Sequence, residues 1–485
     1  MAVAFETGQS LWWLQCAALA ALIGVLHRCS SWKVAAGLGL LFATAWLGAT
    51  FWWLYISMHT FAGLNSALTV LAIASLAAAL GLYYAAACGL YWRLRGEQPF
   101  LACLLFAALW TMAEMARGTW LTGFGWGAVG YAHLTGPLAS YVPWVGAYGV
   151  GALAALLSAG AVYALQRNTA VRLALVALVG VGLLVPVAIP AWSQAAGKLS
   201  VTLLQGNIPQ DEKFQGGSGI PLALQWYGDQ LNRSVTSLVV APETAIPILP
   251  QDLPDGYWDA LTARFAKGDQ AALVGSPWGN MREGYTNSVF AFGPSQPQEW
   301  RYDKHHLVPF GEFIPPLFKW FTRMMNIPLG DFNRGAIGQA SYPWMGQQLA
   351  LNICYEDLFG EELGARFLDT VVAPTIFVNV SNIGWFGDSV AIDQHLQISR
   401  MRALEFERPM LRATNTGATV IIDHTGRVTH SLPRSTRGVL VGNVQGRTGT
   451  TPFAWWVARF GLWPIWIAAL AIVLVAAYAR RTRAV

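Results

Sequence analysis

Long apolar segments occupy both ends of the chain, and a more polar stretch from Leu199 to Gly446 separates them. A helix needs about 17–25 mostly apolar residues to cross a bilayer. Seven segments approach this length: Leu11–Leu26, Val34–Leu54, Ala67–Leu90, Phe100–Met115, Val145–Leu165, Leu173–Ile189 and Leu462–Tyr478. The first is short but lacks a basic lead and a small-residue cleavage site, so we interpret it as an anchor rather than a signal peptide. The pattern predicts a multi-span helical membrane domain.

The polar stretch reads as an α/β domain, because short apolar runs alternate with amphipathic segments. The predicted strands are Leu199–Gln205, Ser237–Ala241, Ala271–Gly275, Asn287–Phe292, Gln348–Cys354, Val371–Val380 and Ala418–Asp423. The predicted helices are Leu222–Asn232, Tyr257–Lys267 and His395–Glu407. We therefore predict a transmembrane domain of six spans over 1–195, an α/β domain over 196–448, and a transmembrane helix with a basic tail over 449–485.

Composition and charge support a membrane protein. Of 485 residues, 54% are hydrophobic and only 12% charged, which is too apolar for an ordinary soluble protein. If the seven spans alternate, most loop cations fall on one side, which the positive-inside rule assigns to the cytoplasm. These cations are Arg28, Lys33, Arg93, Arg95, Arg167, Arg172, Arg480, Arg481 and Arg483. The polar domain then lies outside, and the net charge of +5 gives no reason to expect a nucleic-acid partner.

Three residues of the polar domain form a candidate nucleophile set. Cys354 is the only cysteine between Leu199 and Gly446, and it ends an apolar strand-like run. Glu243 and Lys304 also follow strand-like runs. A thiol can attack an acyl group, a carboxylate can take the thiol proton, and an ammonium can neutralise the oxyanion that develops.

Each of these residues also has a plain structural interpretation. A lone cysteine at a strand end is more often a small buried hydrophobe than a nucleophile. Glu243 could cap a helix, and Lys304 could be a surface lysine. His305, His306 and His395 do not have the spacing of metal ligands, so we predict no metal. We also predict no cofactor. A headgroup-binding role and a structural role are equally consistent with the Glu114 and Arg117 pair near a membrane helix end.

Three motifs carry a family resemblance. They are Ala-Pro-Glu-Thr at 241–244, Lys-His-His-Leu-Val-Pro-Phe-Gly-Glu at 304–312, and Ile-Cys-Tyr-Glu-Asp at 353–357. In this order they resemble the nitrilase (carbon–nitrogen hydrolase) superfamily. The flanking spans and three further motifs narrow the resemblance to the apolipoprotein N-acyltransferase family of bacterial envelopes. These motifs are Ser381-Asn382, Gly384-Trp385-Phe386-Gly387 and Gln394-His395.

The resemblance implies an α-β-β-α sandwich and a triad of Glu243, Lys304 and Cys354. Supporting or substrate-binding roles are predicted for Glu312, Tyr355, Glu356, Trp385 and Asn287. The implied reaction moves an acyl chain from a phospholipid to the N-terminal S-diacylglyceryl-cysteine of an apolipoprotein, through a thioester on Cys354. The implied location is the bacterial inner membrane, with a periplasmic catalytic domain and a cytoplasmic C-terminus. The family usually has eight spans, and seven are found here.

Two other functions remain open from the sequence. The first is a membrane-tethered amidase that uses the same triad with water as the acceptor. The second is a transporter or scaffold whose domain only binds, although the spans hold few of the charged residues that line solute paths. Whether an acyl-enzyme is resolved by an amine or by water distinguishes the acyltransferase from the amidase.

Overall fold

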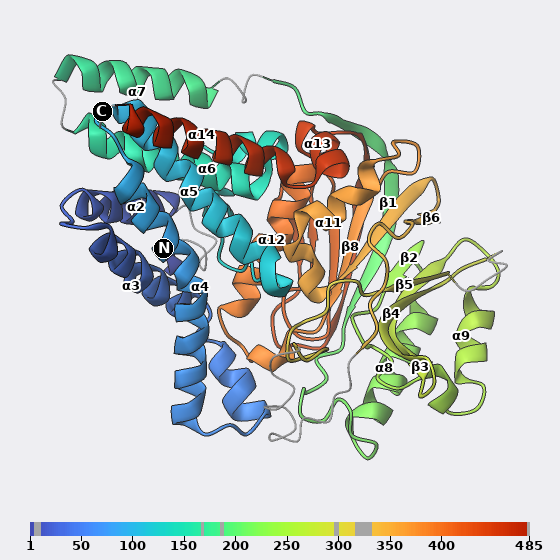
Figure 1. The fold of residues 1–485 in the computed structure, drawn as a ribbon. Helices are drawn as coiled ribbons and strands as arrows, with labels where there is room; N and C mark the ends of the chain where they lie inside the picture. The colour runs from blue at the N-terminus through green and yellow to red at the C-terminus, as the bar shows by residue number, and fades with distance from the viewer. Residues whose placement is uncertain (4–10, 166–168, 185–188, 295–299, 316–331, 483–485) are drawn as a thin grey trace. The chain divides into compact units, whose positions relative to one another are not determined.

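The computed structural model describes residues 1–3, 11–165, 169–184, 189–294, 300–315 and 332–482. The chain divides into two compact units (Figure 1). The first comprises Met1–His59, Leu64–Ala191 and Phe460–Val485, and the second comprises Thr60–Gly63 and Trp192–Arg459.

The first unit is helical, and a helix overlaps every predicted apolar segment. The helices are α2 (Trp12–Leu26), α3 (Trp32–Thr50), α4 (Ser66–Leu94), α5 (Pro99–Thr119), α6 (Val142–Ala164), α7 (Thr169–Leu184) and α14 (Trp463–Arg481). Within the described residues, five of them are long and apolar enough to cross a membrane, whereas α2 and α7 are shorter. Part of the predicted Leu173–Ile189 segment lies outside the described residues.

The segment between α5 and α6 forms irregular turns instead of a continuous helix. Its 3₁₀ turns are η2 (Trp120–Thr122), η3 (Val129–His133) and η4 (Ala139–Tyr141). Arg117 donates to the carbonyl oxygens of Phe124 at 2.6 Å and Trp126 at 2.8 Å. Glu114 accepts the N–H of Val129 at 2.9 Å. Because non-helical backbone in a membrane needs internal partners, these contacts support the structural interpretation of Glu114 and Arg117.

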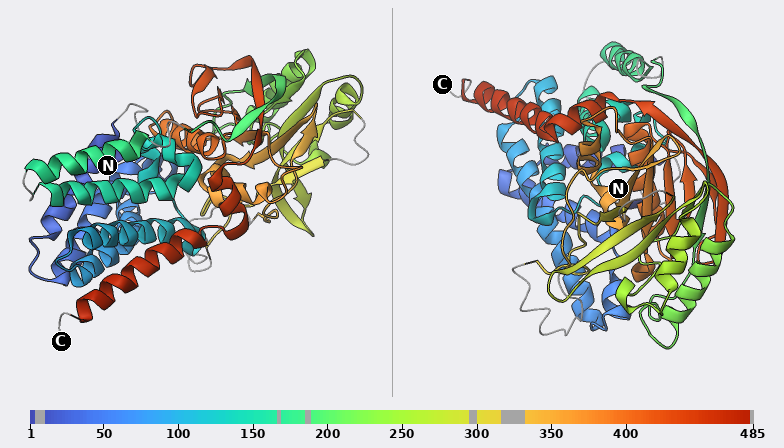
Figure 2. Two further views of the ribbon diagram at one scale, coloured as in Figure 1. Left: turned by 90° about the horizontal axis from the view of Figure 1, so that it is seen from above. Right: turned by 90° about the vertical axis from the view of Figure 1, so that its right-hand side faces the viewer.

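The second unit contains two sheets, each of six strands within the described residues (Figure 2). The first runs in the order β12 (Gly438–Gly449), β1 (Ser193–Gln205), β2 (Leu238–Val240), β3 (Ala271–Asn280), β4 (Gly284–Phe292), β5 (Trp300–Asp303). The second runs in the order β11 (Val428–Ser431), β10 (Val420–Ile422), β9 (Met410–Thr414), β8 (Ile376–Ser381), β7 (Gln347–Ile353), β6 (Tyr342–Trp344).

Alternation of side chains along the strands produces the layers. In β2, Leu238 and Val240 pack into the core between the sheets, together with Leu351 of the second sheet. Val239 points the other way, into a second core. That core is covered by α8 (Gly219–Arg233) and α9 (Tyr257–Phe265).

A helix also packs on the outer face of the second sheet. Phe377 of β8 meets Phe406 of α12 (Ala391–Phe406) edge to face, with ring centroids 5.4 Å apart. The predicted α-β-β-α sandwich is therefore confirmed, since helices cover the outer faces of two sheets that share one core.

Several element boundaries differ from the prediction. The predicted strand Val371–Val380 is wrong in its first half, because β8 begins only at Ile376 and Val371 is 86% exposed. Apolar composition alone does not distinguish an exposed loop from a strand at this point. The strands β6, β9, β11 and β12 were not predicted, and β5 was expected only as a strand-like run without bounds before Lys304.

Candidate active site

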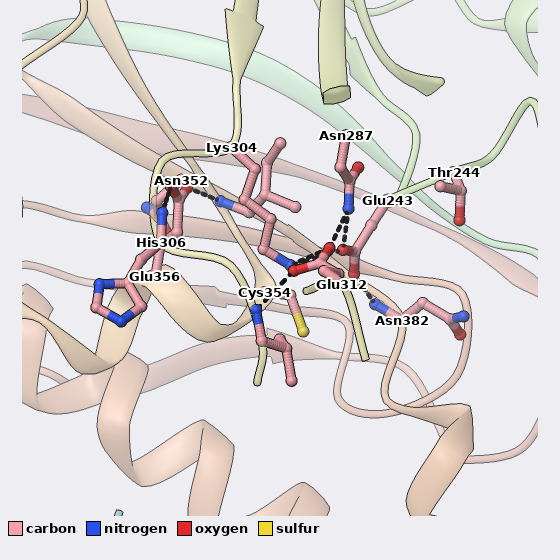
Figure 3. A network of polar contacts seen from close by, with 12 residues as sticks. Glu243, Thr244, Asn287, Lys304, His306, Glu312, Asn352, Cys354, Glu356 and Asn382 are labelled. Atoms are coloured by element: carbon pink, nitrogen blue, oxygen red, sulfur yellow. Dashed lines mark hydrogen bonds and ion pairs between the residues drawn. The ribbon is translucent and has the colours of Figure 1, made fainter. Parts of the chain in front are cut away.

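Cys354 stands at a sharp turn immediately after strand β7. Its φ is +53°, in the left-handed region, and the 3₁₀ turn η8 (Cys354–Leu358) follows. A side chain in this conformation costs about 1–2 kcal/mol, so neighbouring contacts must hold it. The turn brings the thiol beside carboxylate and ammonium groups carried by the loops after β2 and β5 (Figure 3).

Glu243 lies just beyond β2 and is almost fully buried. Its Oε1 accepts from the Lys304 ammonium at 3.1 Å and from the Asn287 amide at 2.7 Å. Its Oε2 accepts from the Asn382 backbone N–H at 2.9 Å. Three donors from three different segments thus fix the position of this carboxylate.

Lys304 directly follows β5 and is buried between two carboxylates. Besides Glu243, its Nζ contacts Glu312 Oε1 at 2.9 Å. Asn287 bridges the same pair, since its amide also donates to Glu312 Oε1 at 2.8 Å. The second oxygen of Glu312 accepts the Val308 N–H at 2.8 Å and so ties the cluster to the loop after Lys304.

The charges of this cluster set the protonation states. Burial alone would raise the pKa of Glu243, but Lys304, Lys213 and Asn287 together lower it below its ordinary value. Burial opposes the charge of Lys304, yet the nearby acidic groups, led by Glu243, raise its pKa well above the ordinary value. Burial, followed by the charge of Glu243, raises the pKa of Cys354. At neutral pH the resting site therefore holds a carboxylate, an ammonium and a protonated thiol.

Glu356 supports the turn from behind. Its two oxygens accept the N–H of Ile353 at 2.6 Å, the Tyr302 hydroxyl at 2.8 Å, and the N–H groups of His305 at 2.5 Å and His306 at 3.1 Å. It therefore joins the end of β7 to the backbone that follows Lys304.

Two other predicted residues make aromatic contacts. Tyr355 is mostly buried and packs against His306 and Phe359. Trp385, on the turn η10 (Gly384–Phe386), is 37% exposed and meets Phe61 edge to face with ring centroids 5.6 Å apart. The structure thus gathers the side chains of Glu243, Lys304, Glu312 and Asn287 around Cys354 (Figure 3). The side chains of Tyr355 and Trp385 pack against other aromatic rings instead.

A second buried lysine was missed by sequence reasoning. Lys213 donates to the Glu243 carbonyl oxygen at 3.1 Å and to the Thr244 hydroxyl at 2.5 Å. Burial lowers its pKa to about 8, against the opposing charges of Glu243 and Cys354. In the sequence it follows Asp211 and Glu212, a pattern typical of a solvated turn, so no sequence signal marked it.

Comparison with known proteins agrees with this architecture. Residues 1–160 match the family "Apolipoprotein N-acyltransferase N-terminal domain", and residues 201–453 match "Carbon-nitrogen hydrolase". The fold and the two matches define an acyltransferase built from a helical membrane part and a carbon–nitrogen hydrolase domain.

Full-length relatives make the assignment more specific. An apolipoprotein N-acyltransferase of Verminephrobacter eiseniae is 56% identical over 482 residues, covering 94% of this chain and 89% of the relative. Another, of Ralstonia nicotianae, is 46% identical and covers 98% of this chain and 90% of the relative. The chain belongs to the apolipoprotein N-acyltransferase family. It is a membrane protein and an enzyme of lipoprotein N-acylation.

Proposed function

We propose that this enzyme takes an acyl chain from a membrane phospholipid, holds it as a thioester on Cys354, and passes it to the amino group of an S-diacylglyceryl-cysteine at an apolipoprotein N-terminus. The observation that carries the proposal is the buried Glu243–Lys304 ion pair beside a cysteine at a strained turn. A cysteine with a neighbouring base and cation has the parts of a covalent acyl-transfer site.

The first half-reaction forms the thioester. The Cys354 sulfur attacks the ester carbonyl carbon of the phospholipid as its proton passes to the Glu243 carboxylate. The carbonyl oxygen becomes an oxyanion, which the Lys304 ammonium and the backbone N–H that follows Cys354 stabilise. The tetrahedral intermediate then collapses, the C–O bond breaks, and the lysophospholipid leaves with the proton from Glu243.

The second half-reaction forms the amide. The neutral amine of the diacylglyceryl-cysteine attacks the thioester carbon at the same site. Glu243 accepts the proton that the nitrogen loses, the C–S bond breaks, and the departing Cys354 thiolate takes this proton back from Glu243, which restores the resting site. Both substrates are lipids, so each reaches one site by lateral diffusion, and ping-pong chemistry removes any need to hold them there together.

We propose that the membrane is the bacterial inner membrane, with the catalytic domain on the periplasmic side and the C-terminus in the cytoplasm. Contacts within the first unit support a common side for the basic loops. Arg480 near the end of α14 donates to the Arg95 carbonyl at the end of α4. Arg95 in turn donates to the His27 carbonyl beside the α2–α3 loop. Three basic ends therefore lie together, as the positive-inside rule requires of a cytoplasmic face.

The test is N-acylation of a synthetic S-diacylglyceryl-cysteine peptide by purified enzyme in phospholipid micelles. We expect Cys354→Ala, Glu243→Ala and Lys304→Ala each to abolish transfer while remaining in the membrane fraction. Lys198→Ala, at an exposed lysine, is the matched control and should retain activity. Transfer that survives any triad substitution removes that residue from the mechanism. Rapid release of the acyl group to water, with no amide product, favours an amidase instead.

A further inference from the structure

A buried polar network lies behind the Cys354 turn and has no place in the chemistry above. Asp357 belongs to η8, His395 and Ser399 are one turn apart on α12, and Arg412 lies on β9. All four side chains are buried. Burying such groups is costly unless they serve one another as partners, so their arrangement needs an explanation.

The contacts fix the protonation of His395. Arg412 Nη2 lies 2.7 Å from His395 Nδ1. A guanidinium only donates hydrogen bonds, so Nδ1 must present its lone pair. The imidazole therefore carries its single proton on Nε2, which lies 3.0 Å from Asp357 Oδ1. Arg412 also pairs with Asp357 at 3.2 Å and completes the ring of contacts.

This N–H also reaches the nucleophile's own peptide group. His395 Nε2 lies 3.2 Å from the Cys354 carbonyl oxygen. The Asn379 amide donates to the same oxygen, also at 3.2 Å. Asn379 is itself held by Asn352 Oδ1 at 2.6 Å, because strands β7 and β8 pair in parallel with these two asparagines opposite each other.

Holding this oxygen has a consequence for acyl transfer. The peptide unit is planar and trans, so a fixed carbonyl at Cys354 directs the N–H of Tyr355 to the opposite side. That N–H belongs to the residue after the nucleophile and is the backbone donor of the proposed oxyanion site. Two external donors also hold Cys354 in its left-handed conformation, which is costly without such contacts.

We propose that His395 and Asn379 are positioning residues, which hold the Cys354 carbonyl so that the Cys354–Tyr355 peptide presents its N–H to the oxyanion. Asp357 and Arg412 keep His395 in the tautomer that can donate. His395 does not act as a base on the thiol, because Nδ1 accepts from Arg412 and Nε2 carries the proton. The inference rests on the proposed thioester chemistry of Cys354.

The test compares two rates at Cys354 in the full-length enzyme in phospholipid micelles. One is formation of the acyl-enzyme, which needs the oxyanion donor. The other is alkylation by iodoacetamide, which needs the thiolate but forms no oxyanion. His395→Asn is too short to donate from the Nε2 position, whereas His395→Gln places an amide N–H near it. His430→Asn makes the same change at an exposed histidine of β11 and is the control.

Removal of one oxyanion donor costs other enzymes about 100- to 1,000-fold, and a displaced donor should cost less. We expect His395→Asn to slow acylation about 10- to 100-fold while alkylation stays within about threefold of wild type. His395→Gln should recover most of the acylation rate, and His430→Asn should match wild type. If His395→Asn does not yield a folded enzyme, Asn379→Ala removes the other donor and should show the same split.

Acylation by His395→Asn or Asn379→Ala within about threefold of wild type overturns the inference. A parallel fall in acylation and alkylation also overturns it, because the network would then act on the thiol and not on the carbonyl. A wild-type enzyme that forms no acyl adduct overturns the proposed function as well. A wild-type adduct with unaffected variants overturns this inference alone.

Discussion

Replacing Glu312 with glutamine should make the Cys354 thiol react faster with iodoacetamide and, at the same time, slow acyl transfer. Glu312 shares the Lys304 ammonium with Glu243, at 2.9 and 3.1 Å respectively. The pKa of Cys354 is raised by burial most of all, then by the charge of Glu243, with a further contribution from Glu312. Glu312→Gln removes one negative charge and keeps the size of the side chain.

The expected magnitudes follow from the loss of this charge. A charge within about 4–6 Å shifts a pKa by about 1–3 units, and we take the lower end because Glu312 is a lesser contributor. A thiol pKa lower by about one unit gives about ten times more thiolate at a fixed pH below it. Iodoacetamide should therefore alkylate Glu312→Gln about tenfold faster than wild type.

Acyl transfer should fall in the same variant. Lys304 loses a charged acceptor, and hydrogen bonds to charged groups are worth about 1.5–3 kcal/mol. If that energy holds the ammonium where the oxyanion forms, transfer slows about 10- to 100-fold. Glu283→Gln, on an exposed turn, is the control for both assays. Unchanged or slower alkylation would refute the assignment of Glu312 as a charge that raises the thiol pKa.

Three further predictions concern charge and packing around the site. Lys213 loses its proton as the pH rises through about 8, which weakens its hydrogen bond to the Glu243 carbonyl oxygen, so acyl transfer should decline there. Lys213→Arg keeps its charge and should move this decline to higher pH in a pH–rate profile. Because the pKa of Glu243 is lowered, the carboxylate persists as the pH falls and is protonated only below the ordinary glutamate pKa of about 4.3. The stability that this carboxylate contributes is lost in the same range of pH. The Asn287 hydrogen bond helps to lower this pKa, so Asn287→Ala should move the acidic fall in acylation rate to higher pH. Glu356→Gln replaces an accepting oxygen with an NH₂ group that faces a backbone N–H donor. The free energy of unfolding should fall by about 1–3 kcal/mol, as measured by thermal unfolding of the detergent-solubilised enzyme.

The sequence predicts which three residues form the triad, but it does not predict the contacts that hold them together. Glu243, Lys304 and Cys354 each follow a strand-like run, and the family motifs identified them as a set. Their mutual distances depend on how β2, β5 and β7 pair within two sheets, and a run of apolar residues does not encode its partner strand.

Other site residues had no local signal. Lys213 sits among acidic residues in a stretch typical of a solvated turn, yet tertiary packing buries it against the Glu243 carbonyl. His395 was noted for its place in a family motif and for lacking a metal-ligand spacing, whereas its contact with Cys354 arises from packing of α12 beside η8. Apolar periodicity reports which face is buried, and it does not report which polar groups meet inside.

Intact-protein mass spectrometry can detect the proposed thioester on Cys354 itself. Purified enzyme in phospholipid micelles without acceptor should gain the mass of one acyl chain, which hydroxylamine releases. A diacylglyceryl-cysteine peptide should discharge it, whereas water should not, and a Cys354→Ser enzyme should carry no thioester. A wild-type enzyme that gains no mass, or whose adduct is lost rapidly to water alone, would contradict acyl transfer through a Cys354 thioester.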